Sequence, residues 1–315
     1  MATQDLFDAC AKGQNRYFYS GLAEGSDGLV HPDARDLVDS FKKAVGSRQQ
    51  AKTNVWISCA ATGASLHYDM GYNLVVQLYG SKTFELLPPE ALSELALPPT
   101  GHPYARQALS VGGSGNSSNF SRFRLGPKDA LYVPPLWAHR TSSGEGASIS
   151  LNIFVGSKAE QLAEELSASP LPFEETWQPQ ELQAAVALYL SSFLTEADVP
   201  LERLRARWDL AELLEETPTT ACSEAPTGHR IQSRGRAAAK RLQALPKAHR
   251  VPVALDYADD VLQGMLEPSI IRSFLHMLPG RIEVASQVGL RSILYRVRSH
   301  QPRWSGTFTI EPMAL

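Results

Sequence analysis

Short apolar runs broken by glycine and proline fill the first half of the chain, from Arg16 to about Val155. Most of these runs are rich in β-branched and aromatic residues, which is typical of β-strands. One segment, residues 34–45, instead repeats its apolar residues at helical spacing. Many short strands predict a sandwich or barrel. The expected strands are residues 17–19, 55–57, 73–79, 83–87, 130–133 and 148–155.

The pattern changes after residue 157, where apolar residues recur at steps of three and four. This spacing predicts amphipathic helices at residues 159–166, 181–194 and 201–214. Further on, a stretch rich in Thr, Pro and Ala lacks any clear pattern and then becomes basic, which predicts a flexible linker. The expected parts are therefore a barrel core at 1–157, a helical extension at 158–215, a flexible basic linker at 216–250 and a small helical region at 251–315.

Composition narrows the class of protein. The 315 residues, 43% of them hydrophobic, are enough for one large domain or two small ones. A net charge of −3 gives no global attraction to nucleic acid or to an anionic membrane. Three cysteines, Cys10, Cys59 and Cys222, are odd in number and far apart, which argues against a disulfide framework and a cysteine-rich zinc module.

No run approaches 18 apolar residues, and the first 13 residues lack an apolar signal core. We therefore expect an intracellular protein, cytoplasmic or nuclear, with no membrane partner.

The segment from Ser65 to Pro89 combines polar residues with a strand pattern. Gly80-Ser81 is a two-residue hairpin signal that places Tyr79 opposite Lys82. Side chains alternate along a strand, so one face collects groups that an apolar core would reject, because burying a polar group without a partner costs roughly 2 to 7 kcal/mol. We expect a polar ligand on this face, which is formed by His67, Asp69, Asn73, Val75, Gln77, Tyr79 and, across the turn, Lys82.

A second segment, residues 129–139, carries His139 at the end of a predicted strand, and the strand at 148–155 places Ser150, Asn152 and Phe154 on one face. Together with His67 and Asp69, His139 completes a set of two imidazoles and one carboxylate. Such a set on one side of a metal leaves the opposite positions open, as in non-haem Fe(II) oxygenases. A structural zinc site would close all four positions, and the spacing offers no fourth ligand.

These two segments, LHYDMGYNLVVQLYGSKTFELLPP and DALYVPPLWAHRTSS followed by SISLNIF, resemble the JmjC/cupin-like Fe(II)- and 2-oxoglutarate-dependent oxygenases. The resemblance is to the small hydroxylase branch that includes the asparaginyl hydroxylase acting on hypoxia-inducible factor, and it covers roughly Trp56 to Val155. It implies a fold that is mainly β with α: a double-stranded β-helix (jelly-roll, cupin) core followed by C-terminal helices.

The resemblance also implies roles for individual residues. His67, Asp69 and His139 match the iron ligands, and Lys82 matches the cation that pairs with the distal carboxylate of 2-oxoglutarate. Where the asparaginyl hydroxylase has a threonine this chain has Ala64, so we expect that hydroxyl contact to be either missing or supplied by Ser65 or Tyr17. Only about 16 residues precede the strand at Tyr17, so we expect the barrel to be shortened at this edge. The remaining matches are hydrogen-bonding groups near the cosubstrate and metal (Asn73, Asn152), pocket-lining residues (Val75, Phe154) and a strand that contributes a tyrosine to the far end of the pocket (Tyr17, Tyr19).

The activity implied is hydroxylation, most consistent with a protein side chain as substrate, using Fe(II), 2-oxoglutarate and O2 and releasing succinate and CO2. Three alternatives stay open: a JmjC-type lysine demethylase, a tRNA hydroxylase that holds RNA through the basic 230–250 segment, and a non-catalytic degenerate JmjC binding module. A homodimer through the helices at 181–214 is a further expectation.

A second H-x-D motif, His31-Pro32-Asp33, is not a candidate site, because Pro32 before the helical pattern is typical of a helix start.

Overall fold

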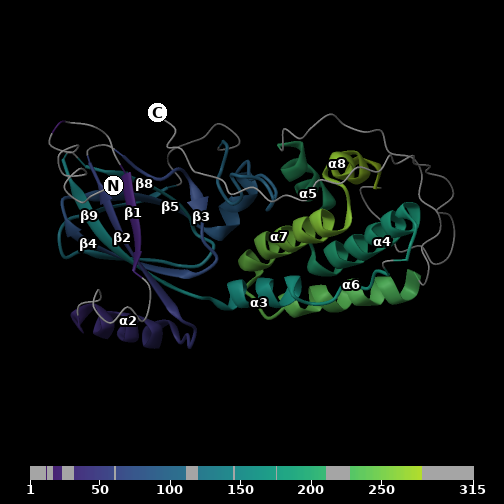
Figure 1. The fold of residues 1–315 in the computed structure, drawn as a ribbon, viewed down its shortest axis with the longest axis horizontal. Coiled ribbons are helices and arrows are strands. Elements are labelled where there is room, and N and C mark those ends of the chain that lie inside the picture. Colours follow the sequence, from purple (N-terminus) through teal and green to yellow (C-terminus); the bar gives the residue numbers. More distant parts are fainter. Residues whose placement is uncertain are drawn as a thin grey trace.

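The computed structural model describes Lys12 and residues 17–22, 32–59, 62–110, 120–144, 146–174, 176–210 and 228–278. A part made mainly of strands lies beside a part made of helices (Figure 1). No helix in the described ranges is long and apolar enough to span a bilayer.

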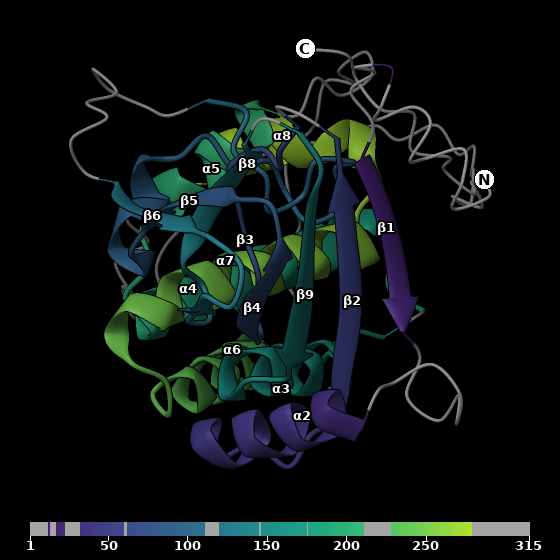
Figure 2. The ribbon, with the colours of Figure 1, turned by 90° about the vertical axis from the view of Figure 1, so that its left-hand side faces the viewer.

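The strands form two antiparallel sheets, one with the order β1-β2-β9-β4-β7 and one with the order β3-β8-β5-β6 (Figure 2). From β3 onward the chain passes repeatedly from one sheet to the other, as in a jelly roll, and helices follow it. The predicted fold class is thus confirmed. The strands are β1 (Tyr17–Leu22), β2 (Ala51–Ser58), β3 (His67–Tyr68), β4 (Tyr72–Tyr79), β5 (Lys82–Leu87), β6 (Ser121–Leu125), β7 (Ala130–Val133), β8 (Ala138–Ser143) and β9 (Ser148–Val155).

Alternation along the strands divides each sheet into an outer and an inner face. On the five-stranded sheet, outward residues such as Leu74 and Ile153 pack with Phe41 of helix α2 (Pro32–Val45), which covers this face (Figure 1). The inward residues, among them Val75 opposite Phe84 of the other sheet, form an apolar cluster between the sheets. The polar residues that share the inner face with Val75 therefore lie inside the barrel.

The expected hairpin at Gly80-Ser81 is wrong, because β4 already has β7 and β9 as neighbours and β5 belongs to the other sheet. Gly80 is instead the corner between the sheets: its φ is 67°, and a Cβ built on it would lie 2.2 Å from the carbonyl oxygen of Ala147. Tyr79 does not share the inner face either. The register shifts between Gln77 and Tyr79, and Tyr79 is 60% exposed.

The helical part begins directly after β9. Its helices are α3 (Lys158–Ser167), α4 (Pro179–Ala197), α5 (Leu201–Asp209), α6 (Gly228–Leu242), α7 (Lys247–Met265) and α8 (Pro268–Met277), and a 3-10 helix, η1 (Pro89–Glu94), lies between β5 and β6. The flexible linker expected at 216–250 is wrong for residues 228–250, which form α6 and the start of α7. Residues 216–227 and 279–315 lie outside the described part of the chain.

The linker prediction failed because two of the four buried residues of α6, Gly235 and Ala239, are small and weaken the apolar signal. Ile231, Gly235 and Ala239 recur every four residues and are buried. A Cβ on Gly235 would lie 2.5 Å from the carbonyl oxygen of Tyr189, so the absence of a side chain lets α6 and α4 approach closely.

The apolar faces of the helices pack within the chain. Phe193 of α4 packs against Tyr257 of α7, with tilted rings whose centroids are 5.0 Å apart, and the same cluster reaches Leu66 and Met70 on either side of β3. The barrel and the helices thus share one hydrophobic core. Dimerisation through the helices at 181–214 stays a prediction.

Candidate metal centre and cosubstrate pocket

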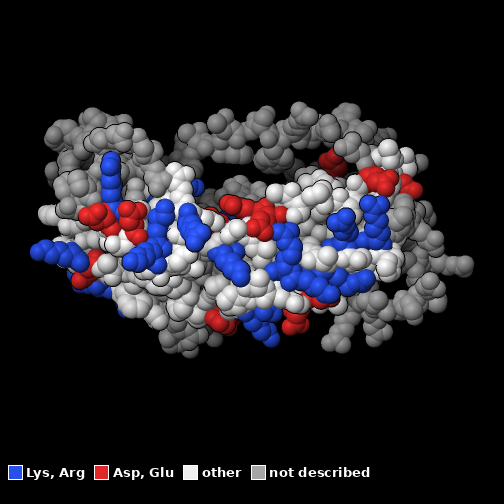
Figure 3. All heavy atoms as spheres, turned by 90° about the horizontal axis from the view of Figure 1, so that it is seen from below, with Lys and Arg blue, Asp and Glu red and all other residues white. Residues whose placement is uncertain are grey.

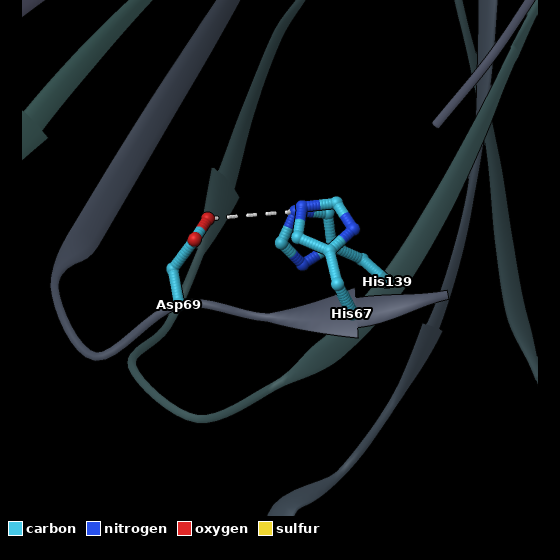
Figure 4. A group of neighbouring side chains, drawn as sticks. All are labelled: His67, Asp69 and His139. Carbon is cyan, nitrogen blue, oxygen red and sulfur yellow. Dashed lines mark ion pairs between the residues drawn. The ribbon is translucent and has the colours of Figure 1, made fainter. Parts of the chain in front are cut away.

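The side chains of His67, Asp69 and His139 meet inside the barrel (Figure 4). His67 lies on β3 directly opposite His139 on β8, and Asp69 follows at the end of β3. Their candidate ligand atoms all lie within 4.8 Å of one another, and the two imidazole centroids are 4.3 Å apart. Residues 72 positions apart in sequence become neighbours because β3 and β8 pair in the four-stranded sheet.

Both imidazoles are oriented by their own backbone. Nδ1 of His67 lies 2.7 Å from the carbonyl oxygen of Ser65, and Nδ1 of His139 lies 3.0 Å from that of Trp137. A carbonyl accepts only, so each Nδ1 carries the proton and each Nε2 keeps its lone pair. This is the arrangement in which histidines bind metals through Nε2.

Burial and the neighbouring His67 lower the pKa of His139 to about 4, against the opposing effect of Asp69. His139 is therefore neutral at pH 7, and its Nε2, 3.7 Å from Oδ2 of Asp69, forms no charged pair with that carboxylate. Two neutral nitrogens and one carboxylate are a donor set that fits a divalent transition metal. The cluster can hold a metal ion.

Lys82 is buried inside the barrel, 3% exposed, although its predicted hairpin does not exist. It lies on β5, where Lys82, Phe84 and Leu86 all point inward and Leu86 is in register with His139. The Lys82 ammonium donates to Oγ of Ser150, 2.9 Å away on β9. Burial lowers the pKa of Lys82 to about 8.

Two further pairs of buried polar side chains join β4 to β9. Nδ2 of Asn152 donates to Oδ1 of Asn73 at 3.0 Å, and Nε2 of Gln77 donates to Oγ of Ser148 at 2.9 Å. Among the described residues, Oε1 of Gln77 has no hydrogen-bond partner although it is fully buried. An unsatisfied polar atom beside a buried lysine marks an interior suited to a polar ligand.

The structure places some of the other predicted pocket residues inside the barrel and others outside it, and it leaves two side chains undescribed. Val75 is fully buried, and Phe154 is half-buried and in register with Asn73. Ser65 does not point inward: it is exposed, and its hydroxyl donates to Oε1 of Gln107 at 3.1 Å. For Tyr17 and Tyr19 only the backbone of β1 is described, and their side chains lie outside the described part.

Two inward residues were missed by sequence reasoning. Asn54 pairs with Asn152 and Trp56 pairs with Ser150 across β2 and β9, so both share the inner face. The available signal was the alternation of residues 51–58, but the alternation alone did not tell which face pointed inward.

Comparison with known proteins found a family model and several similar proteins. The family model described as Cupin-like domain matches residues 3–160. The chain is 30% identical over 141 residues to tRNA wybutosine-synthesizing protein 4 of Gibberella zeae, covering 43% of this chain and 13% of that protein. It is 31% identical over 130 residues to HSPB1-associated protein 1 of Homo sapiens, covering 37% and 26%.

The matched region thus spans less than a third of the length of these relatives. Among solved structures, a cupin superfamily protein from Desulfitobacterium hafniense matches at 14% identity with a TM-score of 0.24, covering 45% of this chain and 79% of that one.

Proposed function

The chain belongs to the cupin-like domain family, and from this premise we propose that it is an Fe(II)- and 2-oxoglutarate-dependent dioxygenase that hydroxylates a protein side chain. The observation that carries the proposal is a buried ammonium in the same barrel as a two-histidine, one-carboxylate cluster. The ammonium can pair with the distal carboxylate of the cosubstrate. The cluster suits a redox metal with open coordination positions.

The spacing along β5 supports a short dicarboxylate. Lys82 lies four residues from Leu86, which is in register with His139. About 13 Å of strand therefore separates the backbone of Lys82 from the backbone of Leu86 and His139. The lysine stem and the imidazole side chain each shorten this span. A ligand that chelates the metal and reaches the ammonium needs only a few carbon atoms, as in 2-oxoglutarate.

Fe(II) held by His67, Asp69 and His139 would supply the redox chemistry that couples oxidative decarboxylation of 2-oxoglutarate to hydroxylation, one atom of O2 entering succinate and the other the substrate C–H bond. The protein's own contribution is orientation and exclusion of water. The carbonyls of Ser65 and Trp137 hold the two imidazoles in register, and Lys82 holds the distal carboxylate. Val75 and Phe84 close the interior between the sheets.

Succinate formation tests the proposal. The chain is incubated with Fe(II), 2-oxoglutarate and a panel of peptides and RNAs, and products are examined by mass for a gain of one oxygen. We expect His67→Ala and Asp69→Ala to abolish iron-dependent succinate formation, whereas His102→Ala, outside the cluster, keeps it. Turnover retained in both cluster variants would contradict the proposed centre. Iron and 2-oxoglutarate binding without any succinate would identify a non-catalytic binding module instead.

An RNA substrate is the second candidate, because a basic helix lies on the surface. The sequence of α6 contains no acidic residue, and Arg230, Arg234 and Lys240 are exposed along it. Figure 3 shows basic side chains gathered on the part of the surface over α6. Two other basic residues of the segment are engaged within the chain: Arg241 pairs with Glu165, and Arg250 donates to the carbonyl of Leu245.

Salt dependence distinguishes this candidate, since each phosphate contact contributes to the slope of log affinity against log salt. We expect replacement of Arg230, Arg234, Arg236 and Lys240 by Gln to reduce that slope by about 3 for a transfer RNA. A control variant that replaces three basic residues near α2, Lys42, Lys43 and Arg48, by Gln is expected to leave the slope unchanged. Equal slopes for all variants would remove α6 as an RNA surface.

Release of formaldehyde from a methylated peptide would instead indicate lysine demethylation.

A further inference from the structure

The helical part is bonded to the short segment, β3 and the residue after it, that carries two of the candidate metal ligands. Tyr68 lies between His67 and Asp69, and because side chains alternate it points the opposite way, out of the barrel and into the helices. It is 2% exposed, and its hydroxyl donates to Asp256 of α7, 3.0 Å from Oδ1 and 3.2 Å from Oδ2. The two faces of this short strand therefore serve the metal cluster and the helices separately.

Asp256 is held by two arginines from different parts of the chain. Nη2 of Arg207 on α5 lies 2.9 Å from Oδ1, and Nε of Arg106 lies 3.2 Å from Oδ2. Arg106 also accepts a hydrogen bond from the backbone N–H of Tyr68 at its own carbonyl, at 3.2 Å. The backbone of Tyr68 is thus bonded to Arg106 and its side chain to Asp256, and these two residues form an ion pair with each other.

The network continues to a second carboxylate, Asp259, whose pKa burial raises to about 7. Nη1 of Arg207 lies 3.2 Å from Oδ2 of Asp259, and Nε1 of Trp208 donates to Oδ1 of Asp259 at 2.8 Å. Two carboxylates therefore face two guanidinium groups, with Asp256, Asp259 and Arg207 almost fully buried. Burying charged groups costs free energy, and close ion pairs offset that cost. The pairs of Arg207 with Asp256 and Asp259 therefore hold α5 and α7 in one arrangement.

β3 is short and is held from both sides. Its two residues pair with β8 on one side, and on the other side His67 forms a single bridge to Gln107 while the backbone N–H of Tyr68 donates to Arg106. Just after the segment, the hydroxyl of Ser157 at the start of α3 donates to the carbonyl of Met70 at 2.6 Å. Contacts from the helices thus reach the ligand segment in its middle, at Tyr68, and directly after it, at Met70.

We propose that Tyr68 and Asp256 are positioning residues that set the geometry of the metal cluster from the helical part. The inference rests on the proposed metal centre, and it assigns to α5 and α7 a role in metal binding beyond packing. Loss of the Tyr68 contact frees β3 to shift, which moves His67 and Asp69 relative to His139.

Co(II) titration of the full chain, followed by visible absorption, tests the inference. We expect Tyr68→Phe and Asp256→Asn to weaken Co(II) binding by about 10-fold or more, as loss of groups that orient metal ligands generally does, and to alter the absorption spectrum. Thermal unfolding in the presence of a chelator measures the accompanying loss of stability. Tyr68→Phe removes one oxygen atom only, so it keeps the experiment informative if Asp256→Asn does not fold.

Tyr189→Phe is the matched control. The Tyr189 hydroxyl is also buried and also bonded to α7, 2.6 Å from the hydroxyl of Tyr257, but it is remote in sequence from the candidate ligands. We expect this variant to lose stability while keeping wild-type Co(II) affinity and spectrum. The same result for Tyr68→Phe would reduce its role to packing and overturn the inference. A wild-type chain that binds no Co(II) would overturn the metal centre itself, and the inference with it.

Discussion

Each candidate imidazole ligand is oriented by the carbonyl two residues before it, Ser65 for His67 and Trp137 for His139. The pattern needs no distant partner, because the same short stretch of chain supplies both the ring and its acceptor. It fixes Nε2 of each ring as the metal-binding atom. At the level of single residues, the cluster is therefore prepared for a metal by local backbone geometry and completed by one carboxylate, Asp69.

Lys82 gives a pH-dependent prediction. Because burial lowers the pKa of Lys82 to about 8, the free protein holds the charged ammonium below pH 8 and loses it above. A dicarboxylate binds the charged form, so its affinity is expected to fall as pH rises beyond 8, and binding at pH 8.5 takes up between about half and one proton. Calorimetry with 2-oxoglutarate and Mn(II) in two buffers of different ionisation enthalpy measures this uptake.

The Lys82→Met variant provides the check. We expect its 2-oxoglutarate binding to be about 10-fold to 100-fold weaker and to take up no proton, since a charge-assisted contact is lost. Lys43→Met, on the exposed side of α2, keeps wild-type behaviour. Proton uptake that persists without Lys82 would assign the titration to another group.

At the scale of the elements, alternation decides what lies inside the barrel. On β9, Ser148, Ser150 and Asn152 face inward, while Leu151 and Ile153 pack against α2. The chain passes from one sheet to the other at Gly80, directly after β4 and shortly before β5. A strand can therefore place polar side chains inside the barrel on one face and pack apolar side chains against a helix on the other.

The Gly80 corner is tested by a matched pair of glycines. Gly80 and Gly46 have nearly the same φ, 67° and 69°, but a Cβ on Gly46 meets nothing within 4 Å. We expect Gly46→Ala to cost about 1 kcal/mol of unfolding free energy from backbone strain alone. Gly80→Ala is expected to cost about 3 kcal/mol, because its Cβ also meets the backbone of Ala147. Urea unfolding measures both, and equal losses would contradict a crowded corner.

Much of this arrangement was predictable from sequence, and the failures have physical causes. Helix α2 and strands β4, β7 and β9 follow from apolar periodicity. Strand β3 has two residues and strand β8 has polar alternation, so neither gives an apolar signal. The hairpin at Gly80 was wrong because a glycine corner and a two-residue turn use the same residue types. Lys82 nevertheless reached the interior, since its alternation with Phe84 and Leu86 does not depend on the turn.

At the scale of the whole molecule, the barrel and the helices form one unit. The hydrophobic core continues from Leu66 and Met70 beside β3 into α4 and α7, and the network around Asp256 crosses the same boundary. This connection could not be read from sequence, because Tyr68 and Asp256 lie 188 residues apart and neither belongs to a recognisable motif. Metal binding and the integrity of the helical part are therefore expected to depend on each other.

The most direct test of the central claim is the stoichiometry of metal binding by His67, Asp69 and His139. We expect a titration with Mn(II), followed by electron paramagnetic resonance, to give one bound ion per wild-type chain. Asp69→Ala and His139→Ala are each expected to lower the affinity at least about 100-fold, because each removes one of three protein ligands. A wild-type chain that binds no ion, or variants that bind it with unchanged affinity, would contradict the account.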